Sequence, residues 1–114
     1  MSNEVKSNTT WQADETHPQI ASSVRETLRE VIDPELGLNI IELGLIREVE
    51  IDTEQAKVTM ILTTPFCPYG PALLEAARSK AQEALDRPVE IEMGTQMWDL
   101  SFMEDGVGGD WGLF

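Results

Sequence analysis

The apolar positions near the N-terminus predict one amphipathic helix. Four apolar residues recur every three or four positions and so share one helical face: Ile20, Val24, Leu28 and Val31. Pro18 suits the first turn of a helix, with Thr16 or His17 as the cap and Thr16 with Gln19 as a capping box. The Asp33–Pro34 step should end this helix, because proline disfavours a helical conformation in the residue before it.

Three strands and a second helix follow from the pattern downstream. Residues 46–51 and 56–63 alternate apolar and polar side chains on either side of a turn at residues 52–55, which predicts a hairpin. A second apolar helical face begins at Pro71 and ends before Pro88. Val89, Ile91 and Met93 alternate with glutamates and predict a third strand, which a helical crossover would place parallel to the second.

The predicted order of elements is helix, strand, strand, helix, strand. This order indicates an α/β (α+β) two-layer sandwich, with two helices on one face of a small mixed three-stranded sheet. We assign residues 1–15 to a mobile tail, with Trp11 as a loose surface contact or a partner-docking residue, and residues 16–96 to the domain. Residues 97–114 form an aromatic and glycine-rich extension. Its Trp98, Phe102 and Trp111 are expected to cover an exposed side of the sheet, or alternatively to form an interaction surface.

The charge balance narrows the classes of partner. The chain of 114 residues carries 8 Lys and Arg against 21 Asp and Glu, a formal net charge of −13. Nucleic acid and anionic membrane surfaces are disfavoured as partners, because clustered cations bind both. The chain opens with no signal-peptide pattern and contains no apolar run of membrane-spanning length, so we expect a cytoplasmic protein whose thiol stays reduced.

The single cysteine, Cys67, lies in the proline-rich stretch T-T-P-F-C-P-Y-G-P. One thiol excludes an intrachain disulfide, and the chain has no CxxC zinc pattern. The prolines stiffen the loop, and the start of the following helix would favour a thiolate. Thr63 and Thr64 could donate hydrogen bonds to that thiolate, or simply finish the strand. Since buried cysteines are commonly inert, position alone leaves a functional and a packing role equally open.

Carboxylates gather in a second segment, D-P-E-L-G-L-N-I-I-E, which carries Asp33, Glu35 and Glu42. An aspartate before proline is a common turn residue, so a structural role is the simpler interpretation. Asp33 and Glu35 would take part in chemistry only if the fold brought them beside Cys67.

Together these segments resemble the SufT-type metal–sulfur cluster assembly domain, which also occurs in the PaaD protein of phenylacetate degradation and in some Mrp-type ATPase scaffolds. The resemblance rests on V-I-D-P-E-L-G-L-N-I-I-E-L-G-L-I, a hairpin, T-T-P-F-C-P and an Ala/Leu-rich helix, over about residues 18–93. It implies a role in the maturation of iron–sulfur proteins, often as a homodimer. It also implies one pocket formed by these residues: Asp33, Glu35, Thr63, Thr64 and Cys67. Phe66 departs from the glycine common before the cysteine, and the chain has neither a P-loop nor a PaaD-like cysteine cluster.

The resemblance implies a metal-binding role for Cys67, but one thiolate cannot hold an iron–sulfur cluster, which usually takes four ligands. We therefore expect a transient cluster that is shared between two chains or completed by a partner or a small thiol. The predicted function is that of a maturation factor rather than an enzyme, with assembly proteins and apo-protein clients as partners. The alternatives are a non-catalytic adaptor with a structural Cys67, and a thiol enzyme acting on a small substrate.

Overall fold

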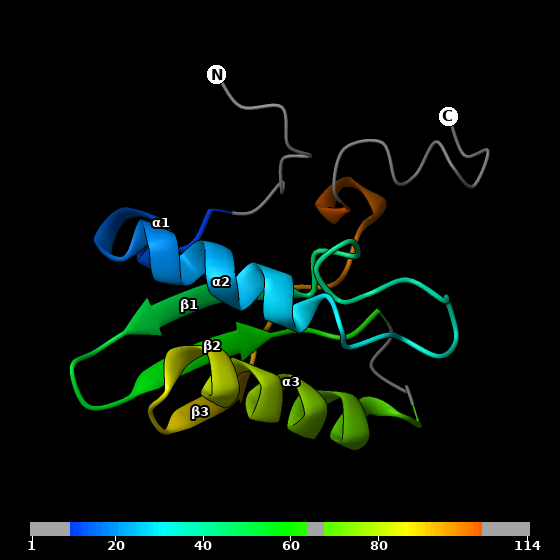
Figure 1. Ribbon diagram of the computed structural model, residues 1–114. Coiled ribbons are helices and arrows are strands. Elements are labelled where there is room, and N and C mark those ends of the chain that lie inside the picture. Colours follow the sequence, from blue (N-terminus) through cyan, green and yellow to red (C-terminus); the bar gives the residue numbers. More distant parts are fainter. Residues whose placement is uncertain (1–9, 64–67, 104–114) are drawn as a thin grey trace.

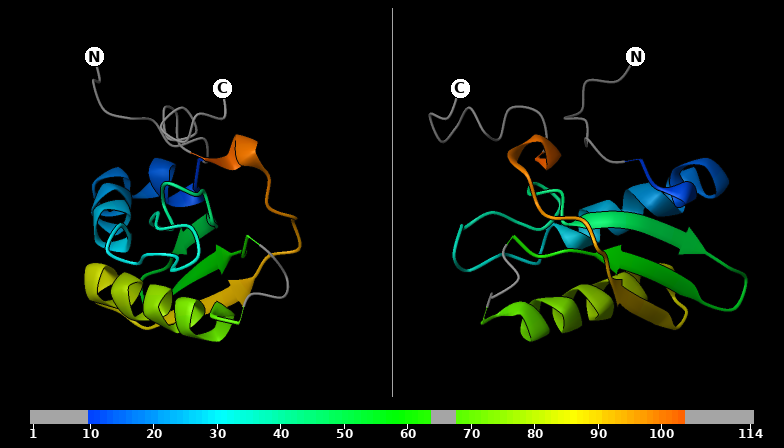
Figure 2. Two further views of the ribbon diagram at one scale, coloured as in Figure 1. Left: turned by 90° about the vertical axis from the view of Figure 1, so that its right-hand side faces the viewer. Right: turned by 180° about the vertical axis from the view of Figure 1, so that it is seen from behind.

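Residues 10–63 and 68–103, described by a computed structural model, form one sheet and three α-helices around a common core (Figure 1). The elements, in chain order, are α1 (Gln12–Thr16), α2 (Pro18–Leu28), β1 (Ile46–Ile51), β2 (Ala56–Met60), α3 (Gly70–Leu85), β3 (Val89–Met93) and the short 3₁₀ turn η1 (Leu100–Phe102). Helices α2 and α3 pack together along one face of the sheet (Figure 2). The predicted two-layer α+β sandwich is confirmed, and α1 is an addition to it.

The sheet has the order β1-β2-β3, with β1 antiparallel and β3 parallel to β2. Both the hairpin and the parallel crossover were predicted from the sequence. Val49, Val58 and Ile91 form one cross-strand row that faces the helices. Strand β2 ends at Met60 rather than at residue 63, because β1 begins opposite Met60 and only one further bond, from Ile61 N–H to the Leu45 carbonyl (2.8 Å), continues the ladder.

Helix α2 ends earlier than its apolar pattern predicted. Its last regular residue is Leu28, and tight turns carry the chain on to Val31, which remains buried. The Val31 carbonyl accepts a hydrogen bond from Ile40 N–H (3.0 Å), and Ile32 forms a bridge with Asn39. The helix therefore ends because residues 31–32 pair with residues 39–40. The N-cap of α2 is His17, one of the two residues expected there, but its side chain makes no capping bond, and the capping box expected from Thr16 and Gln19 does not cap this helix.

The segment before α2 is packed onto the domain where a loose tail was expected. Trp11 is 2% exposed, and its indole Nε1–H donates to the Ile46 carbonyl at 3.0 Å. The Arg25 guanidinium stacks on the indole ring at 3.8 Å, and two of its nitrogens bind the Asp14 carboxylate at 2.6 and 3.0 Å. The expectation of a surface Trp11 is wrong, because the indole gains both burial and a hydrogen-bond partner. Residues 1–9 lie outside the described part of the chain.

The segment after β3 returns to the start of β1. Trp98 Nε1–H donates to the Leu43 carbonyl at 2.8 Å, and the Phe102 ring lies under the Arg47 guanidinium at 3.8 Å. Gly44 has φ +74°, and a Cβ there would lie 2.0 Å from the Phe102 carbonyl oxygen, so only glycine fits. The two aromatic residues were expected on an exposed side of the sheet, but these contacts place them against the residues that enter β1. Trp111 lies outside the described residues.

Candidate functional site

The D-P-E-L-G loop closes around a buried aspartate. Asp33 is 1% exposed, and its Oδ1 accepts hydrogen bonds from the N–H groups of Glu35 (2.8 Å) and Leu36 (3.3 Å). Its own N–H donates to the Leu38 carbonyl (2.9 Å), and its carbonyl accepts from Gly37 N–H (2.8 Å). This is the turn expected of an aspartate before proline. One oxygen of the carboxylate therefore has a structural role.

The second oxygen of Asp33 has no such partner. Oδ2 is buried, and no donor among residues 10–63 and 68–103 reaches it. A buried carboxylate oxygen without a hydrogen bond is costly, so it favours any group that brings a proton or a positive charge to it. Asp33 thus presents a fixed acceptor that the described fold does not use.

The other two carboxylates of this segment differ from Asp33. Glu35 is exposed, and its hydrogen bond to Asp33 is donated by its backbone N–H. Glu42 Oε1 accepts from Asn39 N–H (3.0 Å), while Asn39 Oδ1 accepts from the N–H groups of Ile41 (3.0 Å) and Glu42 (2.8 Å). This reciprocal arrangement is a capping box, so Glu42 stabilises a single turn of backbone.

The described ends of the cysteine loop lie close together. A Cβ at Gly70, the first residue of α3, would lie 2.8 Å from Leu62 Cδ1. Helix α3 has 16 residues, and the positive end of its dipole is directed at the residues before Gly70. Thr63 is half-buried at the entry to the loop, whereas Thr64 and Cys67 lie outside the described residues.

An apolar groove joins the aspartate segment to the start of α3. Its volume is about 510 Å³, with Ile32 and Pro34 on one side and Tyr69, Ala72 and Leu73 on the other. Ile32 and Tyr69 are 49% and 47% exposed, so two large apolar side chains that line the groove are accessible to solvent. The periodicity of the sequence gave no signal for this groove, because its two sides come from segments far apart in the chain.

Thr63 borders a different hollow from the one beside Asp33. That cavity of about 300 Å³ lies between the ends of β2 and β3 and is lined by Met93, Gly94 and Met97 as well as Thr63. The structure therefore brings the Asp33 segment and the start of α3 to one groove, and it places Thr63 on another. The single pocket implied for all five residues stays a prediction, because Thr64 and Cys67 belong to it.

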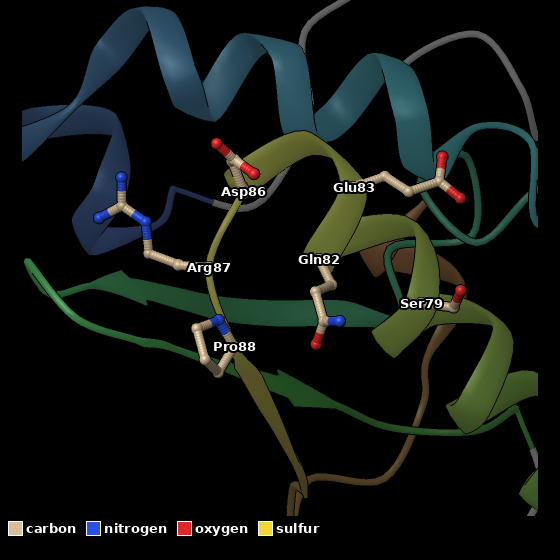
Figure 3. Close-up of a pocket in the computed structure, with 6 residues that line it drawn as sticks. All are labelled: Ser79, Gln82, Glu83, Asp86, Arg87 and Pro88. Atoms are coloured by element: carbon tan, nitrogen blue, oxygen red, sulfur yellow. The ribbon is translucent and has the colours of Figure 1, made fainter.

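A third hollow, of about 530 Å³, lies at the opposite end of α3 and contains no predicted site residue. The side chains of Gln82, Glu83 and Asp86 point in different directions there and do not converge on a common centre (Figure 3). Across the described ranges, no group of three or more His, Cys, Asp or Glu side chains is placed to hold a metal ion. Within the same ranges, no helix combines the length and apolar character needed to cross a membrane.

Comparison with known proteins identifies relatives of this chain. The chain is 43% identical over 54 residues to the Fe-S protein maturation auxiliary factor SufT of Staphylococcus aureus, covering 46% of this chain and 61% of that protein. It is 37% identical over 90 residues to the Fe-S protein maturation auxiliary factor of Porphyromonas gingivalis, covering 76% of this chain and 86% of the relative. The chain thus spans less than two thirds of the SufT relative's length.

A solved structure shares the fold. A domain of unknown function from Bacillus anthracis superposes with a TM-score of 0.75 at 22% identity, covering 88% of this chain and 98% of that one. The family described as iron-sulfur cluster assembly protein matches residues 21–93, which include both the Asp33 loop and the cysteine stretch. That match spans more than half of the chain, and the protein therefore belongs to the iron-sulfur cluster assembly protein family.

Proposed function

We propose that this protein is an iron–sulfur protein maturation factor whose loop cysteine, Cys67, holds or passes on iron, sulfur or a transient cluster as cargo. The observation that carries the proposal is the buried Asp33 carboxylate, whose Oδ2 lacks a partner in the described residues. Its neighbours Ile32 and Pro34 line a groove shared with Tyr69, two residues after Cys67 in the sequence. The names of the SufT-type relatives support the same role.

The chemistry of the donor set fits cargo that is held briefly. A thiolate is a soft ligand that suits iron and sulfur, and the N-terminus of α3 lowers the free energy of a nearby anion. Asp33 and Glu35 supply only hard oxygen atoms, which bind a cluster less well than thiolates do. The remaining ligands would come from the Cys67 of a second copy in a homodimer, from a client or from a small thiol. The role assigned to the chain is delivery in the cytoplasm, with no catalytic turnover.

Anaerobic reconstitution followed by size-exclusion chromatography tests this function. We expect visible cluster absorbance on the wild-type protein, its loss in Cys67→Ala, and a reduced yield in Asp33→Asn, which keeps the Oδ1 acceptor and replaces the other oxygen with an amide. Glu54→Gln, an exposed residue of the turn between β1 and β2 that does not line the groove, serves as the control and should match the wild type. A colourless wild-type protein, or equal absorbance in Cys67→Ala, would overturn the proposal.

An adaptor that recruits clients without holding cargo is the second candidate. The exposed Ile32 and Tyr69 side chains favour it, because apolar groups exposed beside a groove are typical of interaction surfaces. Complementation of a strain lacking the factor separates the two functions. An adaptor would tolerate Cys67→Ser and fail with Tyr69→Ser, whereas a cargo carrier would fail with Cys67→Ser.

A further inference from the structure

The two edge strands of the sheet, β1 and β3, differ in what covers their outer sides. At the β1 edge, α1 packs alongside the strand, Trp11 donates to the Ile46 carbonyl, and an irregularity interrupts the register between Ile46 and Glu48. Strand β3 forms the other edge and has no neighbouring strand on its outer side in residues 10–63 and 68–103. An open edge offers backbone hydrogen-bonding groups to an incoming strand.

The hydrogen bonds to β2 show which residues of β3 face outward. Ala56 N–H donates to the Pro88 carbonyl (2.9 Å), and Gly94 N–H donates to the Met60 carbonyl (2.8 Å), so the even-numbered residues of this stretch face β2. The odd-numbered residues therefore direct their N–H and C=O groups away from the sheet. Val89 N–H is held by Gln82 Oε1 at 3.4 Å. In the described chain, no hydrogen bond from outside the sheet reaches the backbone of Ile91 or Met93.

The charges on the face of the sheet away from the helices indicate which side chains a fourth strand should carry. Two rows of residues run across β1, β2 and β3 on this face, and each ends in a glutamate on β3. The rows are Glu50–Lys57–Glu90 and Glu48–Thr59–Glu92. Lys57 is the single cation in these rows, and its Nζ lies 3.3 Å from Glu92 Oε1. A Lys or Arg in the next position of each row would face a glutamate, and opposite charges in such cross-strand pairs attract.

On the side of the sheet that faces the helices, a fourth strand beside β3 would need apolar residues at its alternate positions. Val49 and Val58 are buried, whereas Ile91 in the same row is half-buried. Met60 is fully buried, yet its neighbour Met93 is 49% exposed. Burial therefore decreases toward the β3 edge, and apolar side chains on a fourth strand would cover Ile91 and Met93.

A second copy of this chain does not fit the edge. Antiparallel pairing of two β3 strands through their outward-facing residues sets Glu90 opposite Glu92 of the other copy, or a glutamate opposite itself. Like charges directly opposite one another are destabilising, and the net charge of −13 on each chain adds to the repulsion.

We propose that the outer edge of β3 binds an extended segment of a partner protein, in which Lys or Arg residues alternate with apolar ones, as a fourth strand. This inference rests on the proposed function for the identity of the partner, which is a client or an assembly protein. Because β3 is parallel to β2, the two strands end at the same end of the sheet. Met93, Met97 and Thr63 line one cavity there, and Met97 is 81% exposed. A segment bound along β3 would thus reach the residue at which the cysteine loop begins.

The probe is a capped synthetic peptide in which Lys and Val alternate, titrated into the full-length protein. We expect binding that slows hydrogen exchange at the Ile91 and Met93 amides, with no binding of a peptide in which Glu replaces Lys. Glu90→Lys combined with Glu92→Lys should weaken the affinity for the Lys peptide by about tenfold or more and allow the Glu peptide to bind. The matched control, Glu26→Lys with Glu54→Lys, makes the same change in net charge away from the edge and should leave most of the affinity intact.

Three results would overturn the inference. They are no binding of the Lys peptide, an equal loss of affinity in the control, and binding without protection of the Ile91 and Met93 amides. Protection of those amides at rising protein concentration without peptide would instead assign the edge to self-association. Glu90→Gln with Glu92→Gln gives the same comparison if the charge-reversed variant fails to fold. Cluster reconstitution on Cys67 is measured separately, so a failed cargo role and a failed docking edge give different results.

Discussion

The β1 and β3 edges of the same small sheet differ in what covers them. The β1 edge is closed by a fully buried indole, a bidentate arginine–carboxylate pair and a short helix, all from residues 11–25. The β3 edge carries two exposed glutamates and a half-exposed methionine, and the outward backbone groups of Ile91 and Met93 have no partner in the described chain. The two edges of this sheet therefore have different roles. The β1 edge is covered by the Trp11 side chain and its neighbours, whereas the β3 edge is left uncovered by the described chain.

The largest effect is expected at Trp11. Trp11→Ala removes a buried indole and leaves the Ile46 carbonyl without its donor, so the free energy of unfolding should fall by about 3–5 kcal/mol. Trp11→Phe keeps most of the packing and loses the hydrogen bond, which should cost about 1–3 kcal/mol. Urea unfolding measures both values. Met93→Ala, at the other edge, is the control and should cost much less; an equal loss at the two edges would break the comparison.

A smaller loss of stability is expected at Gly44, where the segment after β3 packs beside the start of β1. Gly44→Ala brings a Cβ within 2.0 Å of the Phe102 carbonyl oxygen and adds the strain of φ +74°. Gly37 has a similar φ of +72° but no atom within 4 Å of the added Cβ, so Gly37→Ala isolates the backbone strain of about 1–2 kcal/mol. We expect Gly44→Ala to exceed Gly37→Ala in thermal denaturation. Equal melting temperatures would show that the segment at Phe102 adds nothing to the closed side.

The smallest of the three effects concerns Asp14. Burial alone would raise the pKa of Asp14, but hydrogen bonds from the Arg25 side chain and the Trp11 backbone outweigh it and hold the pKa below its usual value. A lowered folded-state pKa contributes stability above the unfolded value of about 3.9, and that stability is lost as the pH falls through the folded pKa. Asp14→Asn should therefore cost about 1 kcal/mol near pH 7, and the difference from wild type should shrink below about pH 4.

Glu92→Gln provides the matched measurement on the open side. Its partner Lys57 lies on the uncovered face of the sheet, where solvent screens the pair. Urea unfolding near pH 7 should show a smaller loss of stability for Glu92→Gln than for Asp14→Asn, because exposed ion pairs contribute little to stability. A larger loss for Glu92→Gln would reverse the assignment of the closed and open edges.

Local patterns were sufficient for the strands, the two long helices and the parallel crossover. Strand β1 has the predicted limits because alternation of apolar and polar residues depends on neighbours in the sequence. The end of α2 was mispredicted because the pairing of residues 31–32 with 39–40 overrides a helical pattern that continues to Val31. Trp11 was missed for a related reason, since a single aromatic residue in a polar stretch has no period to reveal its burial.

The candidate site shows the same division between local and long-range information. The turn made by Asp33 follows from the residue before a proline, and Oδ1 confirms it. The unpartnered Oδ2 and the groove between Ile32 and Tyr69 depend on how distant segments pack, which no single motif encodes. The Met93 and Met97 cavity beside Thr63 was missed as well, because the sequence places those methionines only at the end of a strand.

The hydrogen bond from Trp98 to Leu43 has a consequence for dissecting the protein by truncation. A chain cut after Met93 would lose that bond, the aromatic ring beneath Arg47 and the buried side chain of Met103. Such a deletion would damage the packing around the start of β1, so its phenotype would mix misfolding with any loss of a docking tail. The first cut that spares these contacts lies after Met103, which sets the boundary for assigning a separate role to the last residues.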